Sequence, residues 1–304
     1  MDPQFERKEK TKKLNTIIKV LVSLTLILYI VLKKVDKAEF IKNFELLDWR
    51  FIPLILLLIV GHYIVSSFRW KSLLVHEKAK GVPVRYLLSL YFIGAFFNNF
   101  MPTSIGGDVY KMYRMSKKVG DPGIGFSSVF TERFTGIVML ALIALLSMTK
   151  TLGFGILLLL IWFILGVYIG IFSLKLLSGK IKFLGKVYNA LIIYKNYPKV
   201  LGFAMLTSII VQVLSIFVQY FTFMAIGVRI PIFYAFLAFP VITLVGFFIP
   251  SLNGFGVQDA LYMSTFAIVG VPVTTALSAS IIYHISRIGV SLIGGVLYAL
   301  GKDA

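Results

Sequence analysis

The chain carries a small set of ionisable residues inside stretches that are otherwise apolar. Asp108, Lys111 and Arg114 follow one another at intervals of three residues, which places one acid and two bases along one broad face of a helix. Free backbone N–H groups at a helix start add to such a face, and together they are typical of a phosphate-binding site. The alternative is that Asp108 caps the helix and that both bases extend to a membrane surface.

Four more charged residues lie in or near apolar segments, namely Glu132, Arg133, Asp259 and Arg287. Glu132 and Arg133 are adjacent, so on a helix their side chains point about 100° apart and each needs a partner on another segment. An ion pair between helices and a contact with substrate would both meet this need. Because a charge inside a membrane is costly, all four residues are candidates for function.

Two rows of polar residues recur at helical spacing in apolar segments, one within 200–226 and one within 276–300. Such a row either packs against another helix or lines a hydrophilic groove. The nearby acids and bases favour a groove that passes a lipid headgroup while the tails stay in the bilayer. We expect this groove to be lined by Gln212, Gln219, Ser280, His284 and Ser291.

These residues belong to a chain of 304 residues, of which 58% are apolar and 14% charged, with a mean hydropathy of +0.89. That composition is typical of a membrane protein with several spans. The formal net charge is +18, and the bases cluster between apolar runs, which indicates contact with anionic lipid headgroups and not with nucleic acid. Cysteine is absent, the three histidines lie far apart, and no GxxxxGK[ST] motif occurs, so we expect no cofactor, no metal site and no ATP hydrolysis.

Six apolar runs are long enough to cross a hydrocarbon core of about 30 Å as helices. They cover 14–32, 51–68, 126–149, 152–174, 200–226 and 276–300. The first run follows a basic tail at 1–13, and we interpret it as an uncleaved anchor because no small-residue cleavage site follows it. The sequence therefore predicts an all-α polytopic membrane protein that forms one transmembrane domain over 1–304.

Two further apolar regions, 86–118 and 232–271, are broken in the middle by proline and glycine, and each is predicted to form a re-entrant hairpin. Aligning the two breaks pairs a proline with a proline and, four residues later, a glycine with a glycine. Matching interruptions of this kind indicate an inverted repeat around a transporter binding site, and the alternative is two unrelated kinks. We expect the glycines to supply positive φ or close backbone approach. The hairpin residues are Pro102, Gly106, Gly107, Pro250, Gly254 and Gly256.

The distribution of bases predicts the orientation. Lys and Arg are concentrated in the N-terminal tail, 69–85, 111–118 and 175–199, which places these segments and both termini in the cytoplasm. The first hairpin then enters from the cytoplasm and the second from outside, as an inverted repeat requires. The loop 33–50 is also basic, but acids nearly neutralise it, and we expect it to form an amphipathic helix.

The chain resembles the lysylphosphatidylglycerol synthase transmembrane region family, also called the flippase-like domain family, in its motifs SSFRWKSLL, FNNFMPTSIGGDVYKMYRM, SVFTERFTGI and IPSLNGFGVQDALYM and in a late SRI. The resemblance implies an integral-membrane lipid translocase. Some members move aminoacylated phosphatidylglycerol and others stand near polyprenyl-linked sugar assembly. The positions carried over are Asn98, Pro102, Gly106, Gly107, Asp108, Glu132, Arg133, Pro250, Gly254, Gly256 and Arg287.

The chain departs from the family pattern in two ways. Asp259 stands where a glutamate is expected after the second glycine pair, and no soluble aminoacyl-transfer domain follows residue 304. We therefore expect that this chain does not itself make the aminoacyl lipid.

Together these features predict a flippase for an anionic or polyprenyl-phosphate-linked lipid, or for an aminoacylated phospholipid, in a prokaryotic cytoplasmic membrane. Water around the phosphate would be replaced by Lys111, Arg114, Arg133 and Arg287, while the hairpins gate the groove alternately. These bases would be tuned, or protons accepted, by Asp108, Glu132 and Asp259.

Two other functions compete with this prediction. One is a membrane-embedded lipid-modifying transferase with Asp108 as general base, and the other is an accessory subunit of a lipid or glycan synthase. The expected partners are membrane lipids and, beyond them, a glycosyltransferase or an aminoacyl-lipid synthase. A dimer is compatible with the sequence.

Overall fold

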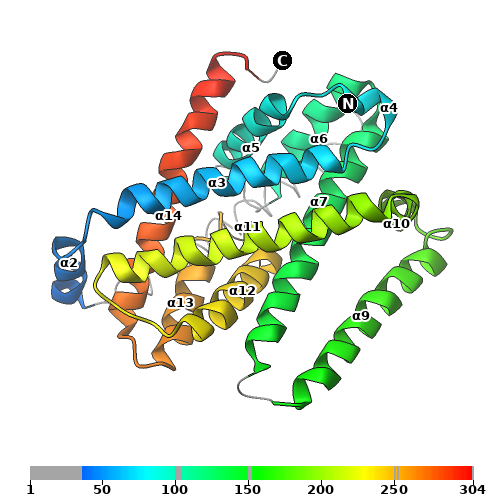
Figure 1. Cartoon of the computed structure of the whole chain (residues 1–304). Coiled ribbons are helices and arrows are strands. Elements are labelled where there is room, and N and C mark those ends of the chain that lie inside the picture. The colour runs from blue at the N-terminus through cyan, green and yellow to red at the C-terminus, as the bar shows by residue number, and fades with distance from the viewer. Residues whose placement is uncertain (1–35, 100–104, 150–152, 250, 252, 303–304) are drawn as a thin grey trace, which may run out of the picture.

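The computed structural model describes residues 36–99, 105–149, 153–249, 251 and 253–302. This part of the chain is built from helices (Figure 1). Its first half holds α2 (Lys37–Glu45), α3 (Phe51–Ser72), α4 (Glu77–Lys80), α5 (Val84–Asn98), α6 (Gly106–Val119) and α7 (Pro122–Ser147). Its second half holds α9 (Gly155–Leu177), α10 (Lys182–Ile192), the 3-10 helix η1 (Ile193–Asn196), α11 (Pro198–Ala225), α12 (Ile232–Phe248), α13 (Val257–Ala267) and α14 (Val273–Ala299). The prediction of an all-α membrane protein is confirmed.

Five of the described helices, α3, α7, α9, α11 and α14, are long and apolar enough to cross a membrane. They correspond to five of the six predicted spans, and their ends lie within a few residues of the predicted ends. The remaining predicted span, 14–32, lies outside the described residues, as do the tail 1–13, Pro102 and Pro250. The count of six spans therefore stays a prediction.

Local sequence explains where two of these helices begin and end. α7 begins early because the Asp121 carboxylate accepts the backbone N–H groups of Gly123 and Ile124, and Pro122 occupies the first helical position. α3 ends at Ser72, four residues after the predicted end of its span at 68. The additional turn includes Arg69, whose side chain is buried within the fold. The helix expected within 33–50 is α2.

Each region broken by proline and glycine forms two helices, α5 with α6 and α12 with α13. In the first region α5 and α6 touch backbone to backbone, because a Cβ on Gly107 would lie 2.1 Å from the carbonyl oxygen of Gly94. In the second region Gly254 and Gly256 have φ of 93° and 78°. The predicted uses of glycine are confirmed at these positions, whereas Gly106 is a helical residue of α6 without positive φ.

Helices from the first half of the chain pack against helices from the second half (Figure 1). α3 runs along α11, α5 packs against α14, and α12 packs against α7. Within each half, α6 packs against α7 and α13 packs against α14. Each broken region therefore contacts the long helix that follows it and also the long helix that follows the other broken region.

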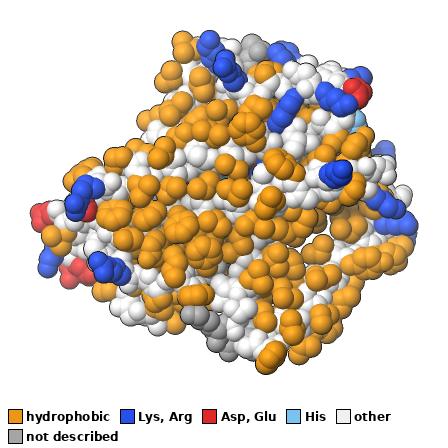
Figure 2. Space-filling view, viewed as in Figure 1, with side chains coloured by type: hydrophobic (Ala, Val, Ile, Leu, Met, Phe, Trp, Pro, Cys, Tyr) orange, Lys and Arg blue, Asp and Glu red, His pale blue; other side chains and the backbone are white. Residues whose placement is uncertain are grey.

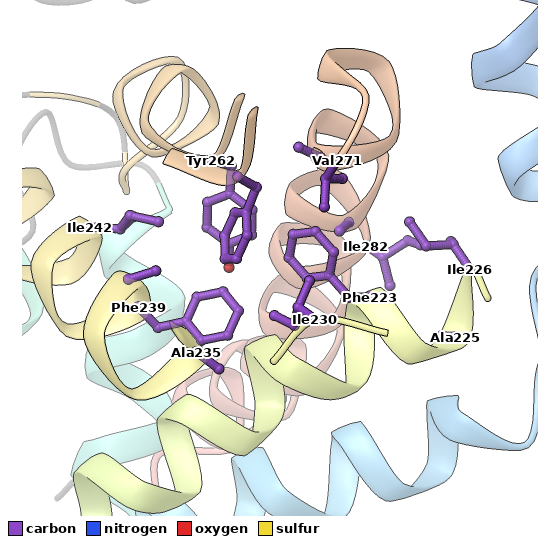
Figure 3. Close-up of a cluster of buried hydrophobic side chains, with 14 of the residues drawn as sticks. Phe223, Ala225, Ile226, Ile230, Ala235, Phe239, Ile242, Tyr262, Val271 and Ile282 are labelled. Carbon is purple, nitrogen blue, oxygen red and sulfur yellow. The ribbon is translucent and has the colours of Figure 1, made fainter. Parts of the chain in front are cut away.

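An aromatic cluster forms the core of the second half (Figure 3). Phe223 from α11, Phe239 from α12, and Tyr262 and Phe266 from α13 are fully buried. The rings of Phe223 and Phe266 lie 4.4 Å apart between centroids. Ring pairs of this kind add about 0.5–1.5 kcal/mol each beyond the burial of apolar area. The cluster fixes α13 against α11 and α12.

The described surface is largely apolar. Figure 2 shows apolar side chains in a broad belt over α3, α11 and α9, with Lys and Arg gathered at the rims. α9 is exposed along most of its length and carries large apolar residues such as Trp162 and Ile164 on its surface. A belt of this kind, with charges at its rims, is suited to contact with lipid tails.

Candidate functional site

Five charged side chains form an alternating chain between α3, α6 and α7. Arg69 pairs with Glu132, and the other oxygen of Glu132 lies 3.2 Å from Lys111 Nζ. Lys111 Nζ also lies 2.9 Å from Asp108 Oδ1, and Asp108 Oδ2 accepts a hydrogen bond from Arg133 Nε. Four of these side chains are buried, and Arg133 is 40% exposed. The prediction that Glu132 and Arg133 turn to different partners is confirmed, and interhelical ion pairs account for both.

Neutral groups hold this charge chain in place. Tyr91 on α5 donates its hydroxyl to Glu132, and Lys111 Nζ lies 4.2 Å above the centre of the Tyr91 ring. Arg69 Nη1 donates to Ser208 Oγ on α11 at 2.9 Å. Buried charges are tolerated when they are paired and hydrogen-bonded in this way.

Asp108 is not the N-cap of its helix, so that part of the alternative is wrong. The N-cap position of α6 is Ile105, and Asp108 is the third helical residue, with its carboxylate bonded to two bases. The predicted residue Asn98 takes part in capping instead, because its Oδ1 accepts the backbone N–H of Gly107 at 2.7 Å. The free amides expected beside Asp108 are therefore partly used.

Arg114 does not join the charge chain. It lies farther along α6 and lines a separate cleft with Tyr86, Lys117 and Lys118. Of the face predicted from the three-residue spacing, the structure brings together Asp108 and Lys111.

A cavity of about 250 Å³ lies beside the charge chain and is lined by residues of α3, α5, α6, α7, α11, α12 and α14. Arg133 is the twelfth of 26 residues in α7 and Arg287 the fifteenth of 27 in α14, so the cavity reaches the middle of both long helices. The predicted residues that line it are Asn98, Gly107, Asp108, Lys111, Glu132, Arg133, Gln212, Arg287 and Ser291.

The ends of the two broken regions meet at this cavity. Asn253 Nδ2 donates to Asn99 Oδ1 at 2.7 Å, and Asn99 Nδ2 donates to Ser291 Oγ at 2.7 Å. Arg287 Nη2 donates to Asn253 Oδ1 at 3.0 Å, and among the described residues no carboxylate lies within ion-pair distance of Arg287. Asn253 has a φ of 48°, a conformation that asparagine adopts more readily than most residues.

A second polar cluster lies between α13 and α14, outside the cavity. Asp259 Oδ1 accepts from Ser280 Oγ at 2.5 Å and lies 3.3 Å from His284 Nε2, and Asp259 Oδ2 accepts the Gly256 N–H at 2.8 Å. Four predicted residues are thus placed away from the cavity, since Gln219 is also buried elsewhere as the acceptor of the Tyr262 hydroxyl. They are Asp259, Gln219, Ser280 and His284.

Sequence reasoning missed several residues that line the cavity, which are His62, Ser66, Arg69, Tyr91, Asn99 and Asn253. Arg69 was assigned to the basic loop 69–85 because the apolar run ends at Phe68. Its neighbour Trp70, fully buried in the structure, was the available signal that the helix continues. Asn99 and Asn253 lie at the predicted breaks, but their pairing depends on the fold.

Comparison with known proteins identifies the family. The model of the lysylphosphatidylglycerol synthase transmembrane region matches residues 16–295, so the chain belongs to this family. No curated protein and no solved structure matches the chain. The family is a membrane family involved in lipid biosynthesis or transport, and this chain is a multi-pass integral membrane protein.

Proposed function

We propose that this member of the family is a flippase for lipids with an anionic phosphate headgroup, including polyprenyl-phosphate-linked lipids and aminoacylated phospholipids. The observation that carries the proposal is the charge of the cavity. Four bases, Arg69, Lys111, Arg133 and Arg287, and two acids, Asp108 and Glu132, line it, which gives a formal net charge of +2 when His62 is neutral. A phosphate crossing about 30 Å of hydrocarbon loses hydration that fixed positive groups can replace.

The four bases have different freedom to bind a phosphate. Arg69 and Lys111 are bonded to carboxylates, so they maintain the positive field and the frame of the site. Arg133 is also bonded to Asp108, but its side chain is 40% exposed and lies over the Phe247 ring. Arg287 is bonded to the neutral amide of Asn253. We assign the direct phosphate contacts to Arg133 and Arg287.

Two buried groups in the cavity support a bound ligand. Ser66 Oγ and Arg69 Nε are buried and make no hydrogen bond with a described residue. A buried donor without a partner costs about 1–3 kcal/mol, and a phosphate oxygen or a glycerol hydroxyl would remove that cost.

The two broken regions are the proposed gates, and their contact through Asn99 and Asn253 is the latch between them. Two observations support an inverted repeat. Asp108 and Arg133 are 25 residues apart, and so are Asp259 and His284, and each pair joins the helix after a break to the next long helix. The exchange of packing partners between the halves also has the form of a twofold relation.

The membrane orientation remains part of the proposal. We place the protein in a cytoplasmic membrane with both termini inside, because bases gather on the side of 69–85, 111–118 and 175–199. A glycosyltransferase or an aminoacyl-lipid synthase is the kind of partner that would supply its lipid.

The structure gives less support to a lipid-modifying transferase. A general base needs a carboxylate oxygen that is free to take a proton from substrate. Both oxygens of Asp108 are already bonded to bases, one to Lys111 and the other to Arg133.

The proposal is tested by following labelled lipids in liposomes that contain the purified protein. Fluorescent phosphatidylglycerol should cross faster than in empty vesicles and faster than labelled phosphatidylcholine, which lacks net charge. Arg287→Gln should slow phosphatidylglycerol about tenfold, because a charge-assisted hydrogen bond contributes about 1.5–3 kcal/mol. Lys302→Gln, beyond the end of α14, is the matched control and should keep the original rate. Equal rates in protein-containing and empty vesicles, with and without ion gradients, would contradict the proposal.

A further inference from the structure

The Asp259–His284 cluster is a second buried ionisable site that the proposed phosphate contacts do not use. The His284 side chain is 1% exposed, and its ring stacks on Phe255 with 4.1 Å between centroids. Its Nε2 lies 3.3 Å from Asp259 Oδ1, and neither ring nitrogen makes a hydrogen bond with a described residue. With a hydrogen on Nε2, the Nδ1 lone pair is available to a proton.

Asp259 is held as an anion that lacks a permanent counter-charge. It accepts hydrogen bonds from Ser280 and from the Gly256 amide, and both favour the ionised carboxylate. Within the described chain no Lys or Arg lies within ion-pair distance of Asp259, so a protonated His284 is the cation that would neutralise it. An imidazole is the side chain whose ordinary pKa allows such a change near neutral pH.

The other titratable and charged side chains near His284 do not replace it as the cation beside Asp259. Tyr283, on the same helix, contacts the His284 ring, and Tyr262 of α13 stacks on Tyr283. Arg287 also lies on α14. From α3, His62 and Tyr63 reach the cavity shared with Tyr283 and Arg287, and from α2, Glu39 accepts the Thr275 hydroxyl near the start of α14. Among these groups, His62 is the other side chain that ordinarily titrates near neutral pH, so the experiment below includes its variant.

Arg287 connects this cluster to the cavity. It lies three residues after His284 on α14, nearly one helical turn away, and its guanidinium is bonded to Asn253 at the cavity wall. A neutral His284 leaves the charge of Asp259 uncompensated, and opposite charges attract, so Asp259 would then compete with the cavity for Arg287. When His284 is protonated, the pair is neutral and Arg287 is available to a phosphate.

We propose that His284 and Asp259 form a proton-binding site that couples proton uptake to binding of the anionic headgroup. This inference rests on the proposed flippase function. One proton passes from water to His284 Nδ1 as one phosphate of charge −1 enters the cavity, so the loaded protein carries no added charge. The lipid and the proton then move together, from the acidic side to the alkaline side.

A pH gradient across liposomes tests the coupling. With the interior one pH unit more acidic, trace fluorescent phosphatidylglycerol should accumulate in the outer leaflet by about tenfold, because one coupled proton transmits one pH unit as a tenfold ratio. His284→Gln should reduce the accumulation to an even distribution. His76→Gln, outside the membrane spans at the start of α4, is the matched control and should retain it, and His62→Gln should also retain a gradient-dependent ratio. An even distribution in the unmodified protein while lipid still crosses would overturn the coupling and leave the flippase function standing.

A measurement without transport separates the two proposals. NMR of protein with isotope-labelled histidine in nanodiscs shows the signals of three side chains, and His284→Gln identifies one set of them. Acidification should shift the His284 signals as the ring takes up a proton, and Asp259→Asn should reduce that shift at a given pH because the counter-charge is lost. This result with no lipid movement in liposomes would overturn the flippase function alone. His284 signals that do not change on acidification, or that change equally in Asp259→Asn, would overturn the proton site.

Discussion

Each broken region places an acid as the third residue of the helix that follows the break, and the surroundings of the two acids differ. Asp108 meets Arg133, 25 residues later in the chain, and Asp259 meets His284 at the same spacing. Three residues after the first acid stands Lys111, which joins two carboxylates, and three residues after the second stands Tyr262 in an aromatic cluster (Figure 3). Similar packing thus supports permanent charge in one half and a neutral or titratable group in the other.

The difference has an energetic consequence. In the first half each buried charge depends on its neighbours, so removal of one member leaves another without a partner. In the second half the rings of the aromatic cluster carry no charge, and the acid is satisfied by a hydroxyl and an amide. The halves should therefore respond unequally to matched substitutions.

The largest effect is expected for Glu132→Gln. It leaves Arg69 and Lys111 with one negative charge fewer, and breaking such a buried pair costs about 3–5 kcal/mol. Asp259→Asn in the second half keeps one of the two acceptor oxygens and should cost about 1–3 kcal/mol for the hydrogen bond that is lost. Reversible unfolding in mixed micelles, followed by tryptophan fluorescence, measures both. Equal losses of unfolding free energy would show that the halves do not differ in this way.

The next effect concerns the glycines at the two breaks. Gly107→Ala drives a Cβ into the Gly94 carbonyl, a backbone contact that cannot rotate away, and should cost about 3 kcal/mol. Gly254→Ala meets strain at φ 93° and the flexible Gln258 side chain, and should cost about 1–2 kcal/mol. Gly166→Ala on α9, where a Cβ meets no atom within 4 Å, is the control and should be neutral or slightly stabilising. A greater loss at Gly254 than at Gly107 would reverse the assignment of the two breaks.

The smallest effect is expected for an exposed ion pair before α3. The Arg50 guanidinium donates to Asp48 at 2.9 Å and holds the pKa of that carboxyl below its ordinary value. A lowered folded pKa contributes stability above the ordinary value of about 3.9, and the contribution is lost as pH falls through the folded pKa. Arg50→Gln should therefore lower the thermal midpoint slightly at neutral pH, and the difference should vanish in strong acid. A difference that persists in strong acid would assign the effect to packing.

Much of the fold could be predicted from the sequence, because span length and apolar composition are properties of each segment alone. The ends of the helices are harder to predict where a polar residue is buried by a distant partner. Arg69 is an example, because its partner Glu132 lies 63 residues later. The breaks were found because proline and glycine interrupt an apolar run locally.

The site was harder to predict because its contacts join distant segments. The spacing of Asp108, Lys111 and Arg114 identified two members of the charge chain, but the third lies along α6 at another cleft. The polar row that contains His284 suggested a groove, whereas His284 packs on Asp259 outside the cavity. The equal spacing of the two acid pairs is present in the sequence, yet it gains meaning once the Asp108–Arg133 contact is known.

The central claim is that an anionic lipid headgroup occupies the cavity, and a single cysteine measures this directly. Ser215→Cys places a thiol in the cavity wall of a chain without cysteine, and Ser264→Cys on the exposed surface of α13 is the matched control. The rate of reaction with uncharged N-ethylmaleimide is compared in nanodiscs of phosphatidylcholine and of phosphatidylglycerol. Labelling of Ser215→Cys should slow several-fold in phosphatidylglycerol and recover when Arg287→Gln is added, while Ser264→Cys reacts equally in both. Equal rates for Ser215→Cys in the two lipids would contradict the claim.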